Sequence, residues 1–117
     1  MVNHQERLGR TFAALADPTR RAIIEQLAHQ ESASVGALAR PFTIKLPAVM
    51  KHLDVLADAG LITRSKTGRT VTVRLRAEPV QEAMQWLTRY ERFWAGSLER
   101  LATHAEREER AARRRPR

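Results

Sequence analysis

Apolar residues recur every three or four positions through the first half of the chain, which predicts short helices that each bury one face. The stripes are Leu8, Phe12 and Leu15; Ile23, Ile24 and Leu27; Val35 and Leu38; and Leu46, Val49, Leu53 and Leu56. Asp17 and Ser34 are placed to cap the second and third helices, and a proline, Pro18 or Pro47, suits the first turn of the second and fourth. Gly60 suits the left-handed position that ends the fourth helix.

The apolar period changes after the fourth helix. Val71, Val73 and Leu75 alternate with polar residues, which is typical of a half-buried strand. The segment "LITRSK" before it is a suitable partner strand, and residues 66–69, with Gly68, form the tip of the predicted β-hairpin.

The last segment predicts one long helix over about residues 79–112. Val80, Leu87, Trp94 and Leu101 recur every seven residues, and Tyr90 and Leu98 lie beside this stripe. The stripe is too long and too aromatic for a small domain to cover alone. The expected fold is therefore mainly α, with five helices and a small β-hairpin: one domain over residues 1–105, then a basic, disordered tail over 106–117.

The third and fourth helices, joined by a short turn, form a helix-turn-helix, and the hairpin makes it winged. With its apolar stripe inward, the fourth helix begins at Pro47 and presents an outer arc of Lys45, Ala48, Lys51 and His52. A helix fits the major groove, where lysine donates to guanine or phosphate, and a small alanine allows close approach. This arrangement predicts a DNA recognition helix.

The hairpin is basic. It carries Arg64, Lys66, Arg69 and Arg74, with Arg76 just after it, a set suited to phosphate or minor-groove contact. A cationic helix surface followed by a cationic hairpin is a more specific indication of DNA binding than charge alone.

Composition agrees with an anionic partner. The 117 residues carry a formal net charge of +8, of which +5 remains without residues 106–117. The chain has no cysteine, which excludes disulfides and thiolate metal sites. No apolar run is long enough to span a membrane and no signal peptide is visible, so we expect a cytoplasmic protein. No catalytic motif is present, and we expect no enzyme and no cofactor.

The segments "LADPTRRAIIEQL", "VGALA", "LPAVMKHLDVLADAGLI" and "RTVTVRL" resemble the ArsR/SmtB winged helix-turn-helix repressors, over roughly residues 8–101. The segment "WLTRYERFWAGSLERLA" resembles a branch of that family without metal-binding cysteines. The resemblance implies a homodimer, with its interface formed mostly by the first and last helices, that binds a partly palindromic operator. The expected interface residues are Leu8, Phe12, Val80, Leu87, Tyr90, Trp94, Leu98 and Leu101.

The chain departs from the family pattern at two positions of the recognition helix. Lys45 stands where the family usually has Ser or Thr, and Met50 stands where a second Ser commonly precedes the basic pair. A helix cap is lost and a polar contact is replaced by a thioether, so base-by-base readout does not transfer from the family. The third helix offers only Ser34 where metal-sensing members carry a cysteine cluster, so no metal site is expected there.

Several features allow two interpretations. Arg20 and Arg21 either contact phosphate or pair with Asp17 or Glu25. His104 and Glu108 are either an ordinary ion pair or two metal ligands. The aromatic residues near the start of the last segment form an interface or line a small-molecule pocket: Trp86, Tyr90, Phe93 and Trp94. The arginine-rich tail either grips DNA or only aids solubility.

The function expected from these observations is a homodimeric repressor that binds double-stranded DNA. Two other hypotheses remain: a protein-interaction or dimerisation module, and a DNA-coating protein without sequence preference. The sequence names no operator and no small-molecule effector.

Overall fold

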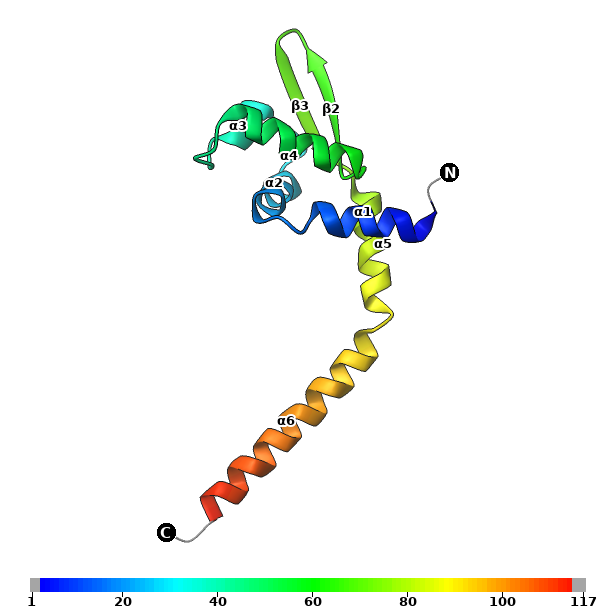
Figure 1. Ribbon diagram of the computed structural model, residues 1–117, viewed down its shortest axis with the longest axis vertical. Coiled ribbons are helices and arrows are strands. Elements are labelled where there is room, and N and C mark those ends of the chain that lie inside the picture. The colour runs from blue at the N-terminus through cyan, green and yellow to red at the C-terminus, as the bar shows by residue number, and fades with distance from the viewer. Residues whose placement is uncertain (1–2, 115–117) are drawn as a thin grey trace. The chain divides into compact units, whose positions relative to one another are not determined.

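The computed structural model describes residues 3–114, without the side chains of residues 91–94. Its helices are α1 (His4–Ala14), α2 (Pro18–Ala28), α3 (Val35–Ala39), α4 (Leu46–Asp58), α5 (Ala77–Thr88) and α6 (Glu91–Arg114) (Figure 1). Its strands are β1 (Ala33–Ser34), β2 (Ile62–Thr67) and β3 (Thr70–Leu75). The described residues are therefore mainly helical with a small antiparallel sheet, which confirms the predicted winged helix-turn-helix.

The chain divides into two compact units, Met1–Ala83 and Met84–Arg117, and the division falls inside α5. The first unit holds α1 to α4 and the sheet. The second holds the end of α5 and all of α6. A single domain over residues 1–105 stays a prediction. Residues 106–114, which were expected to be disordered, are helical and belong to α6.

The helix boundaries in the first unit follow local chemistry. Asp17 caps α2, since its Oδ2 accepts the backbone N–H of Arg20 at 3.1 Å. Ser34 caps α3 in the same way, with its Oγ 3.1 Å from the amide nitrogen of Ala37. Gly60 follows α4 with φ at +75°, a conformation that glycine adopts without strain. All three boundary predictions are confirmed.

The sheet has the order β1-β3-β2 with antiparallel pairing throughout. Gly68, with φ at +62°, and Arg69 form the tight turn between β2 and β3, and the hairpin extends away from the helices (Figure 1). Strand β1 was not predicted, because its two residues are too few to show a period of two. It pairs Ala33 with Val73, which fastens the start of α3 to the sheet.

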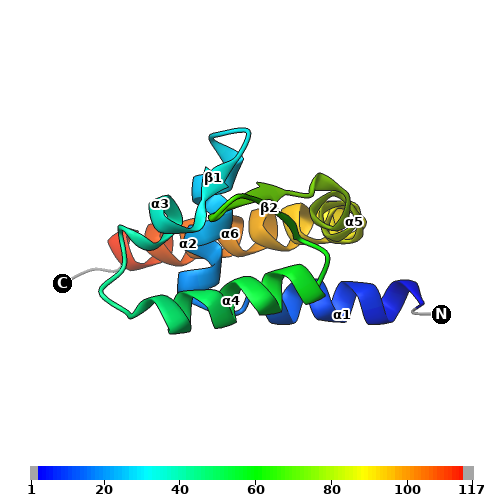
Figure 2. The same cartoon turned by 90° about the horizontal axis from the view of Figure 1, so that it is seen from above.

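The core of the first unit lies where α2 and α4 pack against each other and against the sheet, α2 on β3 and α4 on β2 (Figure 2). Its fully buried residues include Ile23, Leu38, Val49, Leu53, Leu56, Leu61 and Val73. Burying side chains of this size stabilises the fold by about 1.5–3 kcal/mol each. The inner face of α4 is thus held in place, and its outer face is left to solvent.

The prediction of one long last helix was wrong. The helix breaks after Thr88, and α6 begins at Glu91, so the described residues contain six helices and not five. The Thr88 hydroxyl donates to the carbonyl of Met84 at 2.7 Å, and the amide of Tyr90 bonds the carbonyl of Leu87, three residues back. Both contacts compete with the regular helical bonds and tighten the last turn of α5. An apolar pattern does not reveal such a break, because the apolar stripe continues across it.

Candidate nucleic-acid interface

Helix α4 presents the predicted outer arc for a local reason. Pro47 lies in its first turn, where no intrahelical amide bond is lost. Its inward stripe is fully buried at Val49, Leu53 and Leu56. Consequently Lys45 and Lys51 are exposed, and between them the small Ala48 is half-buried.

Leu46 was predicted to point inward with this stripe, and that prediction was wrong. Its side chain is 53% exposed. Leu46 is the first residue of α4, one turn before the point where α2 and the sheet cover the helix. The three-residue spacing to Val49 places both residues on one face, but only the tertiary structure decides how far that face is covered.

The wing carries two kinds of cation. Arg64 pairs with Asp54 of α4 at 2.6 Å, and Arg74 pairs with Glu31 at 3.2 Å. Lys66 and Arg69, at the tip, are exposed and have no ion pair among the described residues. The sequence placed all of these charges on the wing, but it did not distinguish the paired ones from the unpaired ones.

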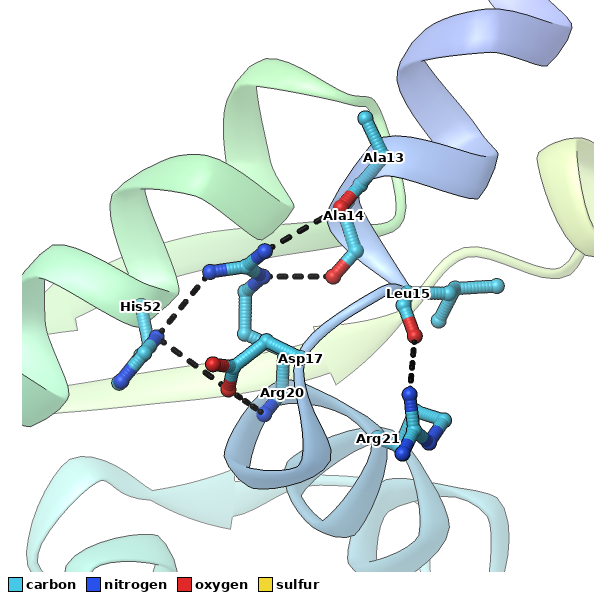
Figure 3. Close-up of polar contacts among 7 residues, drawn as sticks. All are labelled: Ala13, Ala14, Leu15, Asp17, Arg20, Arg21 and His52. Carbon is cyan, nitrogen blue, oxygen red and sulfur yellow. Dashed lines mark hydrogen bonds and ion pairs between the residues drawn. The ribbon is translucent and has the colours of Figure 1, made fainter.

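His52 lies at the edge of the arc and not at its centre. Its side chain is 23% exposed, and its Nδ1 lies 3.4 Å from Nη1 of Arg20 and 3.9 Å from Oδ2 of Asp17 (Figure 3). Arg20 donates to Nδ1 when that nitrogen carries no hydrogen, whereas the contact with Asp17 is an ion pair when His52 is protonated. His52 therefore connects α4 to the start of α2.

Neither Arg20 nor Arg21 forms a side-chain ion pair with Asp17 or Glu25 among the described residues, and a phosphate contact by either one stays a prediction. Arg20 donates from Nε to the carbonyl of Ala14 at 2.5 Å and from Nη2 to that of Ala13 at 3.2 Å (Figure 3). Arg21 donates to the carbonyl of Leu15 at 2.9 Å. These carbonyls end α1, where helical partners are missing and the helix dipole favours a cation. Both arginines cap the preceding helix.

Asp17 completes this junction. The backbone N–H of Arg20 donates to the Asp17 carboxylate and holds its pKa below the ordinary value of 3.8. The charges of His52 and Arg20 act in the same direction, while burial opposes them. The carboxylate is therefore charged at neutral pH and favours a defined placement of α4 on α2.

The expected interface residues divide into two groups. In the first unit, Leu8 is only 4% exposed and Val80 packs against the core, while Phe12 is partly exposed. In the second unit the apolar side chains are exposed, and they include one not predicted, Met84; the set is Met84, Leu87, Tyr90, Leu98 and Leu101. The side chain of Trp94 lies outside the described residues, as does that of Phe93.

The other candidate sites consist of ordinary side-chain contacts in the described residues. His104 Nε2 lies 3.7 Å from Glu108 Oε1 on the exposed surface of α6, and the described residues contain no cluster of three or more metal-ligating side chains. The rings of Trp86 and Tyr90 pack against each other with centroids 5.1 Å apart. In the part of the chain that the structure describes, no helix has the length and apolar character to cross a membrane.

Comparison with known proteins finds a helix-turn-helix family. Residues 15–65, which contain α2, α3 and α4, match a family model described as a helix-turn-helix domain. The HTH-type transcriptional regulator Rv2034 of Mycobacterium tuberculosis is 43% identical over 89 residues, which cover 76% of this chain and 79% of the relative. The transcriptional repressor SdpR of Bacillus subtilis is 28% identical over 83 residues, or 71% of this chain and 91% of SdpR.

Solved structures agree in fold and in sequence. The crystal structure of an ArsR family transcriptional regulator superposes with a TM-score of 0.73 at 40% identity. The match covers 81% of this chain and 97% of that one. It therefore includes the winged helix-turn-helix and extends well beyond the residues of the family model.

Proposed function

Because the chain belongs to the ArsR/SmtB family of DNA-binding transcriptional regulators, which are not enzymes, we propose that it is a homodimeric repressor that binds a partly palindromic operator in the cytoplasm. The repressor assignment is supported by the likeness to SdpR, which carries that name. The proposal assigns α4 to the major groove and the wing to the adjacent backbone.

The observation that carries this proposal is the set of exposed, unpaired cations on two neighbouring elements. Lys45 and Lys51 of α4, and Lys66 and Arg69 of the wing, have no ion pair among the described residues. Holding unpaired cations together costs energy in the free protein, and phosphate contacts offset that cost. Lys45 precedes the first turn of α4, the part of a recognition helix that contacts bases.

The remaining predicted contacts have supporting roles. Pro47 and Ala48 are small and allow the backbone of α4 to approach the groove closely. Arg64 and Arg74 contact phosphate by exchanging their carboxylate partners. The Nε2 side of His52 faces the DNA while its Nδ1 side stays bonded to Arg20, so His52 orients α4 in addition to contacting DNA.

The homodimer is proposed to form through the exposed apolar side chains of the second unit, with Trp94 and Phe12 contributing. An apolar stripe on a helix of this length is stabilised by a second copy of the same stripe. Two recognition helices then meet successive major grooves about 34 Å apart. Replacing Leu101 by Glu should yield a monomer in sedimentation equilibrium, whereas the matched control Thr103→Glu, also exposed on α6, should stay dimeric.

The first experiment is fluorescence-anisotropy titration with the DNA upstream of the gene, against a scrambled duplex, at two salt concentrations. A sequence-specific repressor prefers the first duplex by about a hundredfold or more, a threshold below the usual specificity ratio of roughly 10³–10⁷, and keeps that preference at high salt. Lys51→Ala should weaken specific binding and lower the salt slope by about 1. The control is Lys66→Ala, which removes an equal charge from the wing. It should weaken binding to the two duplexes by the same factor.

The same titration separates the alternatives. Equal, strongly salt-dependent binding to both duplexes identifies a coating protein, because phosphate contacts alone carry no sequence information. Absence of binding to any duplex, including pools of random sequence, favours the interaction module.

A further inference from the structure

A groove of about 430 Å³ lies between the start of α3, the start of α4 and the tip of the wing. Leu46 and Met50 line it from α4, and Arg69 and Val71 line it from the wing. Leu46 and Met50 are four residues apart and therefore share one face of the helix. These are two positions that the DNA-contact prediction from sequence omitted.

The apolar side of this groove is only partly used by the core, because Met50 packs against the core cluster and Leu46 does not. Leu46 is 53% exposed and does not pack against the core cluster, and Ile44, two residues before it, is exposed as well. Met50 is half-buried and presents the rest of its thioether to the groove. An apolar surface at the start of a recognition helix is costly in water, and it offers no hydrogen bond to a base edge.

We propose that this groove reads thymine, with Leu46 and Met50 contacting the 5-methyl groups that thymine presents in the major groove. The inference rests on the proposed function. The methyl group is the only apolar feature that an unmodified base pair displays there, and it is absent from uracil, adenine, guanine and cytosine.

The charges around the groove select DNA as its occupant. Lys45 stands beside Leu46, and Arg69 lines the opposite wall; neither has an ion pair among the described residues. Cations on both sides of an apolar strip match phosphates on both sides of a base-pair edge. The groove is also continuous with α4, the element proposed to enter the DNA.

The test is to replace thymidine by deoxyuridine in the operator. An operator duplex is first defined by footprinting or by selection from random DNA, and its half-site thymines are then replaced one at a time. The exchange removes one methyl group and leaves all hydrogen-bonding groups unchanged. Wild-type protein should lose roughly fourfold in affinity at each contacted thymine, the factor expected for one buried methyl-sized group.

Leu46→Ala, combined with the base change, completes a double-mutant cycle between protein and DNA. The variant should bind the thymine operator more weakly than wild type and should no longer distinguish thymine from deoxyuridine at the contacted position. Because Leu46 is exposed, thermal unfolding of the variant should match wild type. The control is Val55→Ala, a truncation smaller by one carbon of another exposed apolar residue on α4, which should retain the full thymine preference.

Three outcomes are decisive. Loss of thymine sensitivity in Leu46→Ala, with retention in Val55→Ala, supports the proposal. Indifference of wild type to deoxyuridine, or equal sensitivity in wild type and Leu46→Ala, overturns it while the repressor assignment stands. Failure of wild type to prefer any operator over scrambled DNA overturns the proposed function itself, and the thymine inference with it.

Discussion

Nη1 of Arg20 lies 3.4 Å from Nδ1 of His52, although 32 positions separate these residues in the sequence. The same guanidinium binds the last carbonyls of α1 (Figure 3). One side chain thus joins α1, α2 and α4, and the placement of α4, the proposed recognition helix, depends on this junction.

Replacing Arg20 by Ala should lower the free energy of unfolding by about 2 kcal/mol, because two carbonyls and His52 Nδ1 lose a charged donor in a half-buried place. Arg20→Lys should recover little of this loss, since one ammonium group lacks the guanidinium fork. Urea unfolding followed by circular dichroism measures both. Arg21→Ala removes one exposed hydrogen bond and should lower the free energy of unfolding by less than about 1 kcal/mol. Equal losses of stability at the two positions would contradict the role of Arg20 in joining the three helices.

Replacing Lys45 by Ser should stabilise the protein and weaken DNA binding. Lys45 is the N-cap of α4 and makes no side-chain capping bond, so a serine there should raise the free energy of unfolding by roughly 0.5–1 kcal/mol. The same change removes a cation from the DNA-facing surface. The melting temperature should rise in thermal melts, and the DNA affinity should fall in anisotropy titrations. The counterpart Ser34→Ala removes an existing cap and should cost about 1 kcal/mol.

Asp54→Asn should strengthen binding to any duplex. The change releases Arg64 from its 2.6 Å ion pair without altering the size of the side chain. Binding no longer has to break this ion pair before Arg64 contacts phosphate, so affinity for any duplex should rise severalfold. Asp58→Asn, an equal change of charge on the same helix, serves as the control; if it has the same effect, net charge and not the freed arginine is responsible.

Asp17 should make stability depend on acid pH. Its pKa is below 3.8 in the folded protein, so its stabilising contribution is complete well above that value. The contribution is lost as the pH falls through the lower folded-state pKa. Asp17→Asn keeps a capping oxygen but removes the charge. Thermal melts should show the variant less stable at neutral pH, with the difference closing as the pH falls through the lowered pKa of Asp17. A difference that is independent of pH would argue against the carboxylate's role.

Local patterns in the sequence were sufficient for most of the fold. The burial of Val49, Leu53 and Leu56, the caps at Asp17 and Ser34, and the hairpin all follow from periodicity and from side chains that act within four residues. The family resemblance rests on the same segments. Each of these features depends on neighbours in the chain, and the residues therefore identify it without a structure.

The rest was decided by contacts between distant segments. Arg20 caps α1 and holds His52 because α2 and α4 meet there, and Leu46 is exposed because nothing covers the first turn of α4. Arg64 and Arg74 are paired only because the hairpin folds beside Asp54 and Glu31. The sequence by itself determined which residues are basic and which are apolar. The tertiary structure decided which charges stay free and which apolar surfaces stay uncovered, because pairing and burial depend on what another part of the chain brings near.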